Sequence, residues 1–149
     1  MRINQEIQSE KFENEFQKSL VNLIFTYSWA NQNIKALLAP YDITQQQFNV
    51  LRILRGQYPQ PCKIKLVKSR ILDKMSDVSR IVERLLQKQL LVKAENIRDK
   101  RATNILISEK GLALLTKLDM EVDFSKFIRP NITETEAKQL NELLDKFRG

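Results

Sequence analysis

The chain has 149 residues, of which 42% are hydrophobic, and only three glycines and four prolines, a composition that favours one mostly helical domain with a sizeable core. It contains one cysteine and no histidine, which excludes an intrachain disulfide and a multi-cysteine metal site and removes the commonest general base. The whole net charge of +7 lies in residues 62–110, where 13 Lys and Arg oppose 6 Asp and Glu, so this region is either a solvated face or a surface that binds a polyanion.

The chain has no apolar run close to the ~20 residues needed to span a bilayer, and its polar, acidic start has no apolar signal-peptide segment. We therefore expect a cytoplasmic protein with no membrane partner. The lack of histidine and of a cysteine cluster leads us to expect neither an enzyme nor a bound metal or cofactor.

The first long helix is predicted over about residues 10–39, and it ends before Pro40. Its apolar residues follow alternating steps of four and three, the spacing of a heptad seam, with a second stripe beside them. The seam contains Phe16, Leu20, Leu23, Tyr27, Ala30, Ile34 and Leu37, and the stripe Val21, Ile24 and Ser28. Such a helix either buries both surfaces within its own chain or packs one against a second copy, and we favour the second copy.

The second helix has a capping box at its start, with Thr44 as N-cap and Gln47 at N3. Ile43 and Phe48 stand at the positions of a hydrophobic staple, and the helix is predicted to run to about Arg55 before a loop.

Residues 63–72 predict a short third helix, after which Asp73 or Ser76 caps a fourth. The predicted apolar face of the fourth helix comprises Met75, Val78, Val82, Leu85 and Leu86. Its opposite face comprises Ser76, Arg80, Glu83, Arg84 and Gln87.

A β-hairpin follows, with strands at 90–95 and 103–107 and a charged tip between them. Ser108 then caps a fifth helix, which ends before Pro130 and carries Leu112, Leu115, Leu118 and Val122. The final helix repeats the capping box at Thr133 and Glu136, and it is expected to bury Leu140, Leu143, Leu144 and Phe147.

The order of short helix, turn, amphipathic helix and basic-tipped hairpin is that of a winged helix-turn-helix. An α-helix enters the major groove of DNA, where base pairs present distinct donors and acceptors. Ser76, Ser79, Arg80 and Arg84 supply the hydroxyls and guanidiniums that such a helix needs. A cation at the hairpin tip would reach the minor groove, and Asp99 would pair with Arg101 and aim it.

Two segments resemble the MarR family of bacterial transcriptional regulators: "LDKMSDVSRIVERLLQKQLL" at 72–91 and "IRDKRATNILISEKG" at 97–111. The second is similar to the family's wing signature, an Asp-x-Arg tip, a strand, and a Leu-Thr-x-x-Gly helix start. Ile107, Ser108 and Gly111 stand where Leu, Thr and Gly are usual. The chain length and helix order also match, so the resemblance covers nearly the whole chain.

The resemblance implies a mainly α fold with a small β-hairpin wing, in a single domain spanning 1–149. Residues 10–39 and 112–149 would form dimerisation helices, and 44–111 the winged helix-turn-helix lobe. The implied function is a homodimeric, sequence-specific regulator of transcription, a repressor that binds double-stranded DNA at a pseudopalindromic operator. The implied DNA-binding residues are Lys74, Ser76, Ser79, Arg80, Arg84, Arg98, Asp99, Lys100 and Arg101.

Many members of the family release DNA when a small anionic or phenolic effector binds between the dimer helices and the DNA-binding lobe. In this chain, Tyr27, Trp29, Phe48 and Tyr58 either line such a pocket or belong to the core. The alternative function is a winged-helix module that binds a protein and has no specific DNA site.

Two positions depart from the family's pattern. Gln89 replaces the usual glycine between recognition helix and wing, so it must take up a positive φ at some cost or the helix must end differently. Cys62 is outside the first helix, where redox-sensing members carry their cysteine. Three lysines follow it within six residues and would lower its thiol pKa for a redox role, whereas the alternative is an inert, partly buried side chain.

Overall fold

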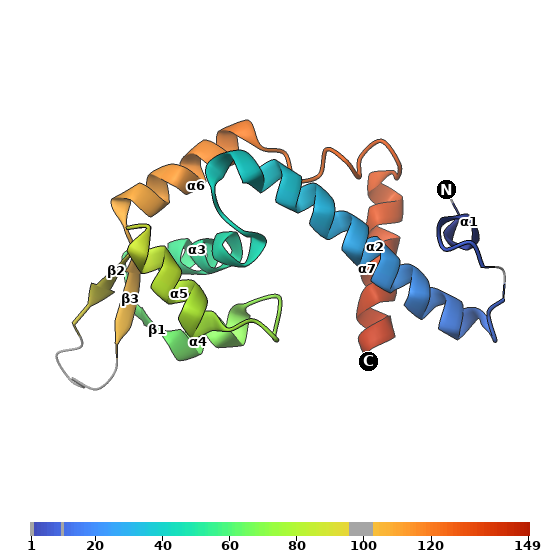
Figure 1. Cartoon of the computed structure of the whole chain (residues 1–149), viewed down its shortest axis with the longest axis horizontal. Helices are drawn as coiled ribbons and strands as arrows, with labels where there is room; N and C mark the ends of the chain where they lie inside the picture. Colours follow the sequence, from blue (N-terminus) through green and yellow to red (C-terminus); the bar gives the residue numbers. More distant parts are fainter. Residues whose placement is uncertain (1, 10, 96–102) are drawn as a thin grey trace.

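The computed structural model describes residues 2–9, 11–95 and 103–149. Its elements, in chain order, are α1 (Ile3–Glu6), α2 (Glu15–Leu38), the 3₁₀ helix η1 (Ala39–Tyr41), α3 (Gln45–Gln57), β1 (Cys62–Lys63), α4 (Ile64–Arg70), α5 (Val78–Gln87), β2 (Leu91–Ala94), β3 (Asn104–Ile107), α6 (Glu109–Glu121) and α7 (Glu134–Arg148). The fold is therefore mainly α with a small sheet, as predicted. Figure 1 shows α3, α4, α5 and the sheet gathered at one end of the molecule, with α1 and α7 toward the other.

The sheet is antiparallel, with three strands in the order β1-β3-β2. The predicted hairpin is confirmed, since Leu91 pairs with Ile107 and Ala94 with Asn104. The third strand, β1, was not predicted, because two residues are too few to show an alternating pattern. It is defined only by its partner β3, where Cys62 lies opposite Ile105.

The core lies where α3, α5, α6 and β3 meet. Leu51 on α3, Leu85 on α5, Ile105 on β3 and Leu115 on α6 are all completely buried. Because α5 is anchored here by one side only, its other side is left to face outward.

The predicted helix starts at Thr44, Ser108 and Thr133 are confirmed, since each side chain accepts a hydrogen bond from the backbone N–H at N3. These caps are local, so short-range sequence rules suffice to find them.

The predicted start of α5 is wrong: Asp77, not Asp73 or Ser76, is the N-cap, and its carboxylate accepts from the backbone N–H of Arg80. Residues 73–76 form a turn in which the Asp73 carbonyl accepts from the backbone N–H of Ser76. Met75 lies in this turn and is 92% exposed, so its assignment to the apolar face of the helix is also wrong.

The outer helices α2 and α7 differ from expectation, α2 in its start and α7 in its burial. α2 begins at Glu15 with Asn14 as its cap, five residues later than the predicted limit. α6 ends at Glu121, before Pro130 as predicted. In α7 no residue is buried: Leu140, Leu143 and Phe147 are exposed and Leu144 is half-buried. The predicted burial of this apolar row is therefore wrong within a single chain.

Candidate nucleic-acid interface

The outward side of α5 carries polar and charged side chains only. Val78, Val82 and Leu85 are buried in the core. The helix consequently exposes Ser79, Arg80, Glu83, Arg84 and Gln87 on the other side. Arg80 and Arg84 are one turn apart, so two guanidiniums project from the same face.

The turn before α5 holds Lys74 and Ser76, which are therefore not helical residues. The Lys74 ammonium donates to the Ser69 carbonyl oxygen over 2.8 Å, which bends this cation back toward the end of α4. The Ser76 hydroxyl is buried and has no hydrogen-bond partner among the described residues.

Asn49 on α3 positions this turn, although no pattern in the sequence distinguishes this residue. Its side-chain oxygen accepts from the Leu72 backbone N–H over 2.9 Å, across 23 residues of chain. An asparagine within a helix carries no such signal on its own, because its partner is defined only by the tertiary structure.

The wing contributes β2 and β3 to this end of the molecule. The predicted tip residues Arg98, Asp99, Lys100 and Arg101 lie outside the residues that the structure describes. The described part of the wing adds one exposed cation, Lys93 on β2.

Gln89 joins α5 to the wing in a left-handed conformation, with φ of 60°. Its N–H donates to the Leu86 carbonyl, and the Leu90 N–H donates to the Leu85 carbonyl. These two bonds form a Schellman motif, which normally has glycine at this position. Of the two alternatives that the family's usual glycine left open, a positive φ or a different helix end, Gln89 thus takes the positive φ.

Gly111 lies where α6 approaches this junction. A Cβ atom on Gly111 would be 2.4 Å from the Leu90 carbonyl oxygen and 2.7 Å from an Ile107 side-chain carbon. The Ser108 hydroxyl reinforces the contact, because it donates to the Gln89 carbonyl over 2.7 Å and accepts from the Gly111 N–H. Glycine is needed here for close approach, not for its backbone freedom.

Cys62 is buried in β1, and burial raises the pKa of its thiol, with Arg70 opposing the shift. Of the two alternatives that the sequence left open, the lysines therefore do not lower this pKa, and the inert, buried side chain is the one that fits. Lys63, Lys65 and Lys68 are exposed to solvent, where their charges are screened. The environment of Cys62 is that of an inert thiol.

The largest cavity, of about 1180 Å³, separates the end of α2 from the start of α3 and from α5. Its charged lining residues are Lys35, Asp42, Arg80, Glu83, Arg84 and Lys88. Cations therefore outnumber carboxylates by two to one.

The four aromatic residues predicted as pocket candidates do not come together. Trp29 packs edge-on against Phe127, and Phe48 stacks on Phe124. Tyr27 and Tyr58 are exposed. The largest cavity contains none of the four, although Trp29 borders a smaller hollow beside α1.

Two characterised proteins are similar to the chain in sequence. The HTH-type transcriptional regulator MhqR of Bacillus subtilis is 25% identical over 131 residues, which cover 87% of this chain and 88% of MhqR. The HTH-type transcriptional repressor IacR of Pseudomonas putida is 28% identical over 116 residues, 76% of this chain and 68% of IacR. No protein-family model matches the chain.

Solved structures share the fold over most of the chain. A MarR-like transcription regulator from Bacillus cereus has a TM-score of 0.78 and 21% identity, with 90% of this chain and 96% of that chain covered. A mutant MarR from E. coli complexed with operator DNA has a TM-score of 0.79 and 22% identity, with 92% and 98% covered. BpsR of Bordetella bronchiseptica, whose DNA binding is regulated by 6-hydroxynicotinic acid, has a TM-score of 0.73 and 21% identity, with 89% and 99% covered.

The helix order and the β2–β3 hairpin agree with the pattern seen in the sequence. The fold is that of the solved MarR structures, and the related sequences are those of HTH-type regulators.

Proposed function

We propose that the protein is a sequence-specific DNA-binding regulator of transcription, with α5 in the major groove and the wing in the minor groove. The observation that carries this proposal is α5 itself, a helix fixed to the core by three apolar residues that turns two arginines outward. This arrangement lies within the one region that holds the chain's excess positive charge. The similarity to HTH-type regulators supports the same function.

The proposed DNA contacts fall into three groups by position. Ser79, Arg80 and Arg84 on α5 face the base edges and the flanking phosphates. Lys74 lies at the entry to the helix, where phosphates pass. Ser76 lies beside it, but its buried hydroxyl would have to turn outward to reach a phosphate. The wing tip would supply Arg98, Lys100 and Arg101, with Asp99 orienting a guanidinium.

The proposed active form is a homodimer that uses α2, α7 and the segment before α7. The accessible surface of one chain is 11470 Å². A compact monomer of 17.5 kDa exposes about 7,900 Å² on the usual scaling of area with mass. The surplus of about 3,600 Å² on one chain exceeds the roughly 1,000–2,500 Å² that each partner of a large, obligate homodimer interface usually buries, so one chain has ample surface for a second copy.

Much of this extra accessible surface is apolar, as expected for a surface that a second copy would cover. The exposed apolar side chains include Phe16, Leu20, Ile24 and Tyr27 on α2 and Leu140, Leu143 and Phe147 on α7. Contiguous apolar surface of this extent usually marks an interface. A two-fold dimer would present two copies of residues 44–111 to successive major grooves, which predicts a pseudopalindromic operator.

The regulator is proposed to be a repressor controlled by a small anionic or phenolic effector. IacR is a repressor by name, and BpsR responds to 6-hydroxynicotinic acid. The cationic cavity beside α5 supports an anionic ligand, because its occupant would contact Arg80 and Arg84 directly. Because its partner would be the chromosome, we place the protein in the cytoplasm; no described helix is long and apolar enough to cross a membrane.

Selection of binding sites from a random duplex library, followed by fluorescence anisotropy on the selected site, tests the function. We expect a pseudopalindrome, and affinity that falls steeply with salt because bound phosphates release counterions. Arg84→Ala should weaken binding by about 1–3 kcal/mol, whereas Lys138→Ala on α7 should leave it unchanged. Failure to enrich any sequence would favour the protein-binding alternative.

A further inference from the structure

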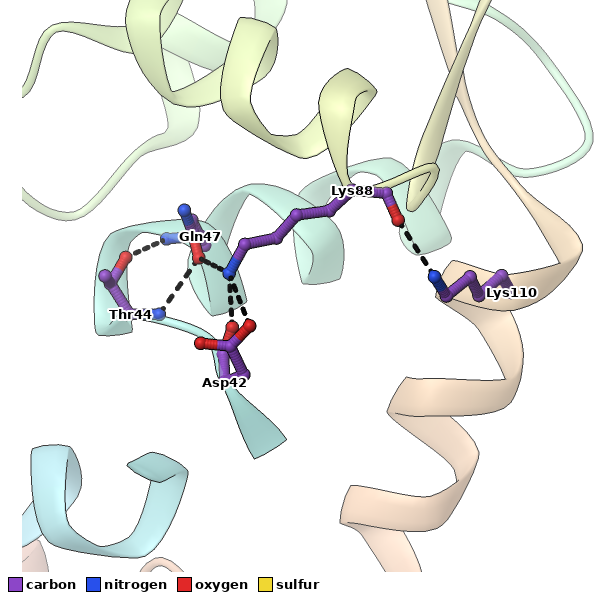
Figure 2. A network of polar contacts seen from close by, with 5 residues as sticks. All are labelled: Asp42, Thr44, Gln47, Lys88 and Lys110. Atoms are coloured by element: carbon purple, nitrogen blue, oxygen red, sulfur yellow. Dashed lines mark hydrogen bonds and ion pairs between the residues drawn. The ribbon is translucent and has the colours of Figure 1, made fainter. Parts of the chain in front are cut away.

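The side chain of Lys88 connects the end of α5 to the corner between α2 and α3. Figure 2 shows its ammonium among three oxygens of that corner. It donates to the Asp42 carbonyl, lies 3.4 Å from the Asp42 carboxylate and donates to the Gln47 side-chain oxygen over 3.5 Å. The Lys88 side chain is 33% exposed, whereas that of Asp42 is 98% exposed, so the ammonium is partly shielded from water but the Asp42 carboxylate faces solvent.

The corner presents these oxygens in a preset arrangement. Asp42 has a left-handed backbone, with φ of 53°, and its N–H is bound to the Ala39 carbonyl over 3.2 Å. Gln47 is buried, and its side-chain oxygen also accepts from the Thr44 N–H over 3.1 Å as part of the capping box of α3. The corner's own hydrogen bonds therefore position the Asp42 backbone and the Gln47 side chain, and the Lys88 ammonium adds further bonds to their oxygens.

The backbone of Lys88 is held as firmly as its side chain. Its N–H donates to the Arg84 carbonyl within the last turn of α5, and its own carbonyl accepts from the Lys110 ammonium on α6 over 3.1 Å. One residue thus joins the end of α5 to α6 on one side and to the corner on the other (Figure 2).

We propose that Lys88 is a positioning residue for DNA binding, whose ammonium, held by Asp42 and Gln47, sets the direction of α5 relative to α2. The inference rests on the proposed function, since α2 carries the dimer surface and α5 the DNA-reading face. In a dimer, the angle between these helices determines the separation of the two α5 helices. Lys88 therefore governs which spacing of half-sites fits, and it does so without contacting DNA.

Energetics distinguish this role from a merely stabilising one. A partly exposed ion pair contributes little to folding free energy. Its directional hydrogen bonds nevertheless decide between orientations of an already folded helix. The affected property should then be the geometry of DNA binding rather than the stability of the fold.

The test compares full operators with half-sites for the wild type, Lys88→Met and Lys88→Arg, with Lys138→Met as the matched loss of one exposed lysine. For Lys88→Met we expect affinity for the full operator to fall about tenfold while half-site affinity stays within about twofold. Its preference for the native spacing over operators with one base pair added or removed at the centre should shrink, and Lys88→Arg should restore it. Equal losses on both DNAs, or no loss on either, would overturn the proposal.

A second experiment uses the free protein without DNA, so its result tests the role of Lys88 independently of the proposed function. Lys88→Met should accelerate amide hydrogen exchange at residues 42–47 in the free protein, with Lys138→Met unchanged. If the wild type enriches no operator, the proposed function fails while this experiment still reports on the connection. Unchanged exchange at the corner would overturn the role of Lys88 whatever the DNA experiments give.

Discussion

Gln89 adopts a strained backbone conformation that glycine would adopt without a cost in free energy. Its φ of 60° places it in the left-handed region, where a side chain costs about 1 kcal/mol or more. Gln89→Gly should therefore raise the free energy of unfolding by about 1 kcal/mol, measured by urea denaturation. The Schellman hydrogen bonds use only main-chain atoms, so they survive the change.

The control for this variant is Gln89→Ala, which removes the amide side chain and keeps the Cβ atom. Its unfolding free energy should stay near that of the wild type. A gain from alanine equal to the gain from glycine would contradict the backbone explanation.

Gly111 is the opposite case, because neighbouring atoms leave no room for a Cβ atom there, whereas its φ does not require glycine. Gly111→Ala would place a Cβ atom 2.4 Å from the Leu90 carbonyl oxygen, and we expect a loss of about 2 kcal/mol in unfolding free energy. Gly56→Ala is the matched control, since its Cβ would meet no atom within 4 Å and α3 should gain up to about 1 kcal/mol of helix propensity. Thermal or urea denaturation that moved both variants in the same direction would disprove the close-approach argument.

At the scale of the element, the beginning of α5 depends on one carboxylate. Asp77 accepts from the Arg80 N–H over 3.1 Å, so Asp77→Ala should cost about 1 kcal/mol of stability. Asp77→Asn keeps an oxygen in the same place and should lose little. Denaturant titrations in which both variants lose equally would assign the effect to the charge instead of to the cap.

The same element shows how far local rules reach. Asp73, Ser76 and Asp77 are all good N-cap residues within five positions of one another, so sequence alone left the choice open. The hydrogen bond from the Leu72 backbone N–H to Asn49 holds the turn that precedes Asp77. That contact spans 23 residues, and helix-capping rules do not consider contacts at such a separation.

For the whole molecule, the apolar rows of α2 and α7 predict an obligate association. Leu143 is 64% exposed on α7, and Leu143→Asp should convert a dimer to monomers or unfold it, because a charge would be buried at the interface. Sedimentation equilibrium with circular dichroism would report both outcomes. Leu72→Asp, at an exposed apolar residue in the turn before α5, should leave the mass unchanged. A folded dimer for Leu143→Asp would remove α7 from the interface.

The sequence by itself determined the elements whose cause is local. The capping residues Thr44, Ser108 and Thr133 and the two hairpin strands act over a few residues, and all were found in the right places. The buried side of α5 from Val78 onward was also predicted, whereas its start was not. At Gln89 the sequence left two alternatives open, a positive φ or a different helix end, and the structure has the positive φ. The excess of positive charge in residues 62–110 was likewise readable before any coordinates.

Features that depend on residues far apart in the sequence were decided only by the tertiary structure. Strand β1 exists because β3 supplies its hydrogen bonds. Burial raises the pKa of the Cys62 thiol in that strand, an effect that the lysines next to it in sequence do not indicate. The acceptors around the Lys88 ammonium lie more than 40 residues away along the chain. Apolar periodicity showed that α7 has a face to bury, yet periodicity does not say against what, and the fold of a single chain leaves that face uncovered.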